Sequence, residues 1–281
     1  MFTTITVIET RHTSTVDQKL ADAAFGNIPG SWPLPTATTP QQLWLRAVAA
    51  GGQGRYGSAY RDLAELRRTG AAGRLVSLAH STQASFLRQL GWHTLARGWD
   101  GRALALAGAD SEARSDALIG LAADALGIGR FASATTLLAR EDALPGLAVP
   151  DRLAVRRRWV AAELAMASGD GGSAVRHAEE AVELAEGMAS GPIGALARHR
   201  VKSQMVLAAA LCSAGSTERA RAVGEAALEA TGRLRLLPLR WALASLLIDI
   251  GSVSLPVRKL REIRDICAGQ VRRAGGAWRS A

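Results

Sequence analysis

The side chains that most often carry out catalysis or bind metals are scattered along this sequence. None of its five histidines and two cysteines lies at the spacing of a metal site or a catalytic pair. His177 precedes Glu180 by one helical turn, but no third ligand accompanies them. Neither a nucleophile motif GxSxG nor a phosphate-binding GxxxxGK motif is present. The sequence therefore predicts a protein that is not an enzyme and needs no metal ion or cofactor.

Arginine is the other abundant residue type in this chain that could take part in binding. The chain has 34 basic and 25 acidic residues, and only Lys19, Lys202 and Lys259 are lysine. Together with the excess of alanine and glycine, this bias is typical of a GC-rich bacterial genome, so the high pI alone does not indicate nucleic-acid binding. The charge is uneven, however. From Arg233 onward, ten basic and three acidic residues carry +7 of the net charge of +9.

These residues must be positioned by helices. Alanine, the best helix former, is very frequent, and strand-type runs are nearly absent after the first ten residues. Residues 40–273 keep a helical period and are expected to form one domain. Residues 1–39, which end in a proline-rich stretch that resists helix, are expected to be a partly disordered extension with one helix at 16–25. Residues 274–281 are expected to be a flexible tail.

A repeat organises the helical region. Six glycines follow one another at steps of 37, 38, 40, 46 and 36 residues, and two helix-length segments fit within each interval. Each glycine is expected to end the first helix of a hairpin, with an aromatic residue two positions later filling the elbow. An alanine five positions after the glycine is expected where the two helices approach most closely. The five matching pairs are Gly54 with Ala59, Gly91 with Ala96, Gly129 with Ala134, Gly169 with Ala174, and Gly215 with Ala220.

This pattern resembles the tetratricopeptide repeat, in which a glycine–polar–aromatic turn precedes an alanine. Tyr56, His93 and Phe131 occupy the aromatic position in the first three units, whereas Gly171 and Thr217 replace it in the next two. The resemblance implies an all-α fold: a right-handed α-solenoid of about six helix–turn–helix units. The amphipathic segment 255–273 is expected to be a capping helix. Another kind of α-solenoid or a helical bundle remains open.

The resemblance also implies that the first helix of each unit lines a concave groove where partners bind. Trp44, Trp159 and Trp241 fall at the same position in three units, either as binding hot spots or as packing residues. Arg156 and Lys202 share another position, which favours an acidic peptide or a carboxylate unless these cations are only solvated. The predicted partner-binding residues are Trp44, Arg88, Arg156, Trp159, Glu163, Lys202, Met205 and Trp241.

Three functions follow from these patterns. The first is a non-catalytic scaffold or adaptor that holds an acidic peptide or protein. The second is a transcription-regulatory or sensor protein whose basic C-terminal end contacts nucleic acid or polymerase, and the third is peripheral membrane attachment through the last helix. The basic residues of that end are Arg258, Lys259, Arg261, Arg264, Arg272 and Arg273.

The expected location is the cytoplasm. The first nine residues do not resemble a signal peptide, and no run approaches the roughly 18 apolar residues of a membrane span. Cys212 and Cys267 lie within helical patterns and are expected to be small buried residues in a reducing compartment.

Overall fold

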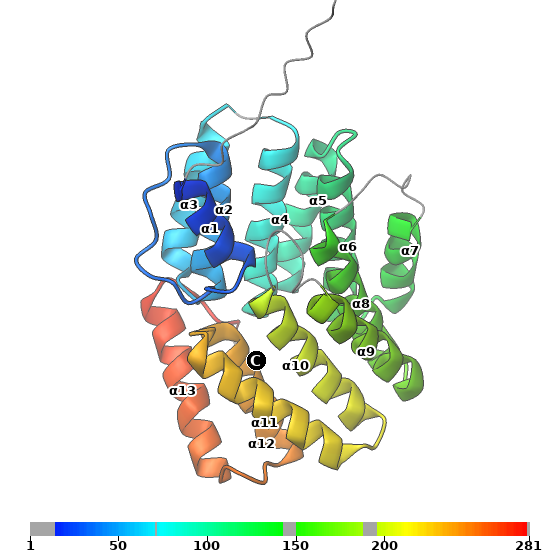
Figure 1. Ribbon diagram of the computed structural model, residues 1–281. Coiled ribbons are helices and arrows are strands. Elements are labelled where there is room, and N and C mark those ends of the chain that lie inside the picture. The colour runs from blue at the N-terminus through cyan, green and yellow to red at the C-terminus, as the bar shows by residue number, and fades with distance from the viewer. Residues whose placement is uncertain (1–14, 71, 143–149, 188–195, 280–281) are drawn as a thin grey trace, which may run out of the picture.

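The structure is a computed structural model that describes residues 15–70, 72–142, 150–187 and 196–279. Within these ranges the chain forms thirteen α-helices and no strand, so the prediction of an all-α fold is confirmed. Figure 1 shows how the helices follow one another around the molecule. They are α1 (Thr15–Phe25), α2 (Pro40–Gly52), α3 (Tyr56–Arg68), α4 (Arg74–Gln89), α5 (His93–Leu106), α6 (Ser111–Gly127), α7 (Phe131–Asp142), α8 (Asp151–Ala167), α9 (Gly171–Gly187), α10 (Ala197–Ser213), α11 (Thr217–Arg233), α12 (Leu237–Ile250) and α13 (Val257–Arg273).

The helices from α2 onward form six antiparallel hairpins, beginning with α2–α3 and ending with α12–α13. The first helices of consecutive hairpins also contact one another, from α2 against α4 through to α10 against α12. Each second helix contacts the first helix of the next hairpin. Stacking of neighbouring hairpins in this way defines an α-solenoid. The predicted architecture of about six units is therefore confirmed.

The turns within the hairpins form as the repeat pattern predicts. All six repeat glycines have a positive φ, a region that glycine enters without steric cost. In five units the second helix begins two residues after the glycine, and in the sixth it begins six residues after Gly251, at Val257. The five alanines of the pattern are completely buried. A side chain of one methyl group at this position lets the two helices pack closely.

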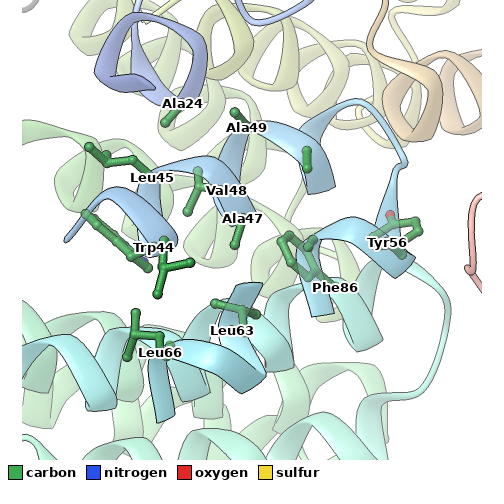
Figure 2. Packing of buried hydrophobic residues seen from close by; sticks show 14 of the residues in the cluster. Ala24, Trp44, Leu45, Ala47, Val48, Ala49, Tyr56, Leu63, Leu66 and Phe86 are labelled. Carbon is green, nitrogen blue, oxygen red and sulfur yellow. The ribbon is translucent and has the colours of Figure 1, made fainter. Parts of the chain in front are cut away.

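The aromatic position behaves differently from unit to unit. Tyr56 is fully buried and packs against Phe86 (Figure 2), with ring centroids 5.5 Å apart. Its hydroxyl donates a hydrogen bond to Gln89 Oε1 at 3.0 Å. Phe131 is 40% exposed, so the prediction that it fills the elbow of its hairpin is wrong. The difference lies in what covers the elbow. The segment after α13 lies over Tyr56, where the amide of Gly57 donates to the carbonyl of Ala274 at 2.7 Å.

The N-terminal region packs onto the solenoid. Thr39 caps α2 by accepting a hydrogen bond from the amide of Gln42, and Pro40 begins the helix, as predicted. Helix α1 buries Leu20, Ala23 and Ala24 in the same cluster as α2 residues, part of which Figure 2 shows. The expected extension is therefore a packed element from residue 15 to residue 39, while residues 1–14 lie outside the described part.

The two ends of the solenoid meet, with α13 beneath α2 and α3 in Figure 1. Val271 of α13 belongs to the same apolar cluster as Tyr56. Beyond α13, the amide of Arg279 donates to the carbonyl of Leu90 at 2.9 Å, and Trp92 Nε1 donates to the carbonyl of Ala277 at 2.6 Å. The expectation of a flexible tail is wrong for residues 274–279, which close the solenoid into a ring. This closure was not visible as a local sequence pattern, because it depends on how the twist accumulates over six units.

Candidate functional site

A cavity of about 450 Å³ lies on the concave face, at the centre of the ring. The first helices of all six hairpins contribute to its wall, and α1 adds Phe25. The volume falls within the usual range for small-ligand pockets, roughly 300–1,000 Å³. The structure brings together every partner-binding residue that the sequence predicted, although binding itself stays a prediction. These residues are Trp44, Arg88, Arg156, Trp159, Glu163, Lys202, Met205 and Trp241.

Each of the three predicted tryptophans is fixed in the cavity wall by its neighbours. Trp44 donates its indole N–H to Thr82 Oγ1 at 3.0 Å, and only 4% of the residue is exposed. Trp159 donates to Ser203 Oγ at 2.8 Å. Trp241 packs against Trp278 of the closing segment, with ring centroids 4.3 Å apart. These tryptophans therefore line the cavity and also pack against their neighbours, so the wall is preorganised.

Arg88 is held by two buried carboxylates. Its Nη1 lies 2.9 Å from Asp100 Oδ2 and 2.5 Å from Asp124 Oδ1, and both acidic side chains are fully buried. Burial disfavours the charge on Arg88, but the two carboxylates outweigh this and raise its pKa. Burial raises the pKa of Asp100 to about 7, although Arg88 opposes the shift. Gly120 leaves the space for this carboxylate, because a Cβ there would lie 2.3 Å from Asp100 Oδ2.

Three further cations of the wall also have acidic partners. Arg156 forms an ion pair with Asp116, and Lys202 Nζ lies 3.2 Å from Glu163 Oε1. Arg152 Nη2 donates to Glu112 Oε1 at 2.5 Å. The predicted basic character of Arg156 and Lys202 is therefore largely neutralised within the wall. Burial, together with nearby Arg88, lowers the pKa of Arg156 to about 10, which still leaves it charged at neutral pH.

Arg198 differs from the other cations of the cavity. Its Nη1 donates to the carbonyl oxygen of Val48 at 3.0 Å, and it has no acidic partner among the described residues. Burial and the neighbouring charge of Arg152 lower its pKa to about 10. The guanidinium groups of Arg152 and Arg198 both lie within 6 Å of the centroid of the Phe25 ring. Gly52 makes room for Arg198, since a Cβ there would lie 2.5 Å from Nη1.

Several polar atoms of the wall lack a hydrogen-bond partner within the described chain. Ser81 Oγ, His93 Nδ1 and His199 Nδ1 are buried without one. Burial lowers the pKa of both histidines, that of His199 well below its usual value, so both rings are neutral at pH 7. His199 stacks on Trp159 with centroids 5.4 Å apart. Buried polar atoms are nearly always paired in folded proteins. These atoms can therefore form hydrogen bonds with a water molecule or with a ligand in the cavity.

Sequence reasoning missed several residues of this wall. Phe25 comes from α1, which has no repeat pattern to place it, and His93 was expected only to pack in a turn. Arg152 was detectable in principle, because it precedes Arg156 by one helical turn on the same face. Arg198 precedes Lys202 by about one turn on α10. Its reach across the ring to α2 is a tertiary contact that no local pattern predicts.

The basic residues predicted at the C-terminal end lie on α13, away from the cavity lining. Lys259 Nζ pairs with Glu262 Oε2 at 3.0 Å, and Arg264 Nη2 with Asp265 Oδ1 at 2.9 Å. Within the described ranges, no helix is long and apolar enough to cross a membrane, and no cluster of three metal-binding side chains occurs. The exposed cations of α13 are Arg258, Lys259, Arg261, Arg272 and Arg273, while Arg264 is half-buried.

Comparison with models of known protein families and with curated protein sequences gives no match for this chain. A fold by itself does not define a function, since one fold hosts many.

Proposed function

We propose that this protein is a non-catalytic adaptor, built from degenerate tetratricopeptide-like repeats, that binds a short acidic peptide segment of a partner in the central cavity. The observation that carries the proposal is Arg198, a cation that has no acidic partner in the described part of the chain, in a wall whose other cations have one. A partly desolvated cation without a counter-ion is costly, and a carboxylate would remove that cost through charge-assisted hydrogen bonds.

The shape of the cavity limits the kind of partner. Residues 274–279 close the ring, so a bulky protein surface does not fit inside a space of about 450 Å³. A few residues of extended peptide do fit. Their apolar parts would lie against Phe25, Trp44 and Trp159, while one carboxylate meets Arg198. Tryptophan and arginine are also the residues most enriched at binding hot spots.

Arg198→Met is the most informative variant, because it removes the charge and keeps most of the apolar stem. Immobilised wild-type protein is incubated with a mixture of random seven-residue peptides that have free C-terminal carboxylates, and the retained peptides are identified by mass spectrometry. We expect acidic peptides to be enriched by the wild type and lost by Arg198→Met. Ser85→Trp, which fills the cavity from α4, should lose them as well.

Two matched variants control for non-specific effects. Arg200→Met removes a neighbouring arginine of α10 that does not line the cavity, and Thr136→Trp adds a tryptophan on the exposed face of α7. Both should retain the same peptides as the wild type. The proposal is wrong if the wild type enriches no peptide, or if Arg198→Met and Ser85→Trp retain the same peptides as the wild type. Charge reversal at Arg156 is a poorer test, because it also breaks the pair with Asp116.

A second candidate function rests on the surface of α13. Arg258, Arg261, Arg272 and Arg273 are exposed there and have no acidic partner within the described residues. We propose as the alternative that this face contacts nucleic acid. Phosphate contacts make such binding strongly salt-dependent. A mobility-shift titration with duplex DNA at about 50 mM salt tests it. Binding that weakens with salt and with Arg258→Gln/Arg261→Gln would support it, and no shift would exclude it.

A further inference from the structure

A second, smaller hollow continues the central cavity along the concave face. It has a volume of about 170 Å³ and lies between α8, α10 and α12. Glu163, Lys202, Met205 and Ala242 border both spaces. The hollow is reached from the cavity by moving about one helical turn toward the C-terminal ends of these helices. The two spaces are therefore neighbouring compartments of one concave surface.

The chemistry of the hollow differs from that of the cavity. Its only charged residues, Glu163 and Lys202, pair with each other at 3.2 Å, so neither charge requires a ligand. The remaining lining is apolar, and most of these side chains are only half-buried. Methionine side chains adapt well to apolar groups of irregular shape. The apolar residues are Met166, Met205, Val206, Ala209, Ala242 and Leu246.

The register along α10 fixes the spacing between the two compartments. Arg198 lies at the start of this helix, and Val206 lies eight residues later. At 1.5 Å per residue this separates their backbones by about 12 Å. An extended peptide covers 3.3–3.6 Å per residue, so roughly three to four residues span the distance. Trp159 and His199, stacked on each other, line the cavity wall between α8 and α10.

We propose that this hollow is a specificity subsite for an aliphatic side chain of the same peptide whose carboxylate meets Arg198. The proposal rests on the proposed function of the central cavity. It adds that the ligand has two recognition elements, a carboxylate and a leucine-like side chain about three residues before it. The continuity of the two spaces and the absence of any uncompensated charge in the hollow select an apolar group of the same ligand.

Two fluorescein-labelled peptides with amidated C-termini test the subsite, namely Ser-Leu-Ala-Ala-Asp and Ser-Ala-Ala-Ala-Asp, in which the aspartate supplies the carboxylate that meets Arg198. Their affinities for the full-length protein are measured by fluorescence polarisation. Burial of a leucine side chain should make the first peptide bind roughly tenfold more tightly than the second. Ala209→Phe fills the hollow, so it should abolish this preference and leave the affinity for the second peptide unchanged. Ala132→Phe, on the exposed face of α7, is the matched control.

A second variant tests the hollow by enlarging it. Leu246→Ala should shift the preference from leucine toward phenylalanine at the same peptide position. The subsite is overturned if the wild type binds both peptides equally, or if Ala209→Phe keeps the full preference for leucine. Those outcomes leave the proposed function intact, provided that Arg198→Met still abolishes binding. Failure of both peptides to bind the wild type would overturn the carboxylate site and this subsite together.

Discussion

Arg88 and Arg198 both line the central cavity, one from α4 and the other from α10. Arg88 contacts two fully buried carboxylates, and its Nη1 also donates to the carbonyl of Gly120 at 3.0 Å. Among the described residues, Arg198 donates one hydrogen bond, to the carbonyl of Val48, and its guanidinium group lies 5.9 Å from the centroid of the Phe25 ring. Both rely on a helix glycine that leaves space, Gly120 beside the Arg88 cluster and Gly52 beside Arg198.

The difference separates a structural cation from a binding cation. The Arg88 cluster has one positive charge for two carboxylates, so it has no need of an anionic ligand. Arg198 has the opposite balance, because the charged neighbour that acts on its pKa is another arginine, Arg152. Loss of one partner of a buried ion pair is expensive, whereas loss of an uncompensated cation is not. The same substitution should therefore have very different effects at the two positions.

Arg88→Met should produce the largest change in stability. It leaves Asp100 and Asp124 buried without a cation, and breaking a buried pair in this way costs about 3–5 kcal/mol. The free energy of unfolding is measured by urea denaturation at pH 8, above the pKa of about 7 to which burial raises Asp100 in the wild type. The triple variant Arg88→Met/Asp100→Asn/Asp124→Asn should recover part of the loss. A change below about 1 kcal/mol for Arg88→Met would contradict a structural role.

The repeat pattern of the sequence predicted the six hairpins and the positions of their turns. Those features follow from local rules, such as a positive φ at glycine and a methyl group where helices cross. The pattern also predicted which first-helix residues share the concave face. It did not predict that Arg88 is neutralised and Arg198 is not. Asp100 and Asp124 reach Arg88 from two other helices, and Val48 meets Arg198 across the closed ring.

The Asp100 carboxyl should make stability depend on pH. Burial raises its folded-state pKa to about 7 from an ordinary value of 3.8. Between these values the folded protein binds a proton that the unfolded chain releases, so the free energy of unfolding falls as pH rises. Asp100→Asn should remove this fall, on the order of 1–3 kcal/mol between pH 5 and pH 8. Urea denaturation of both proteins at the two pH values provides the measurement.

Other titratable groups near Asp100 also make stability depend on pH. The effect of Asp100 is therefore obtained by comparing the wild type with Asp100→Asn. Burial raises the pKa of Asp124 as well, which adds to the fall, whereas it lowers the pKa of His93, which opposes it. Arg156, whose pKa is lowered to about 10, remains charged throughout the window. The contribution of Asp100 is therefore the wild-type change minus the Asp100→Asn change. Equal changes in the two proteins would show that this carboxyl does not titrate between pH 5 and pH 8.

Arg198→Met should have the smallest effect on stability, within about 1 kcal/mol of zero. The variant loses one hydrogen bond to the carbonyl of Val48, but it also removes a cation that burial and Arg152 disfavour. These contributions have opposite signs and similar size. Urea denaturation alongside Arg200→Met measures the effect. A loss as large as that of Arg88→Met would mean that Arg198 holds the closed ring together. A negligible loss combined with loss of peptide binding would assign Arg198 to the ligand.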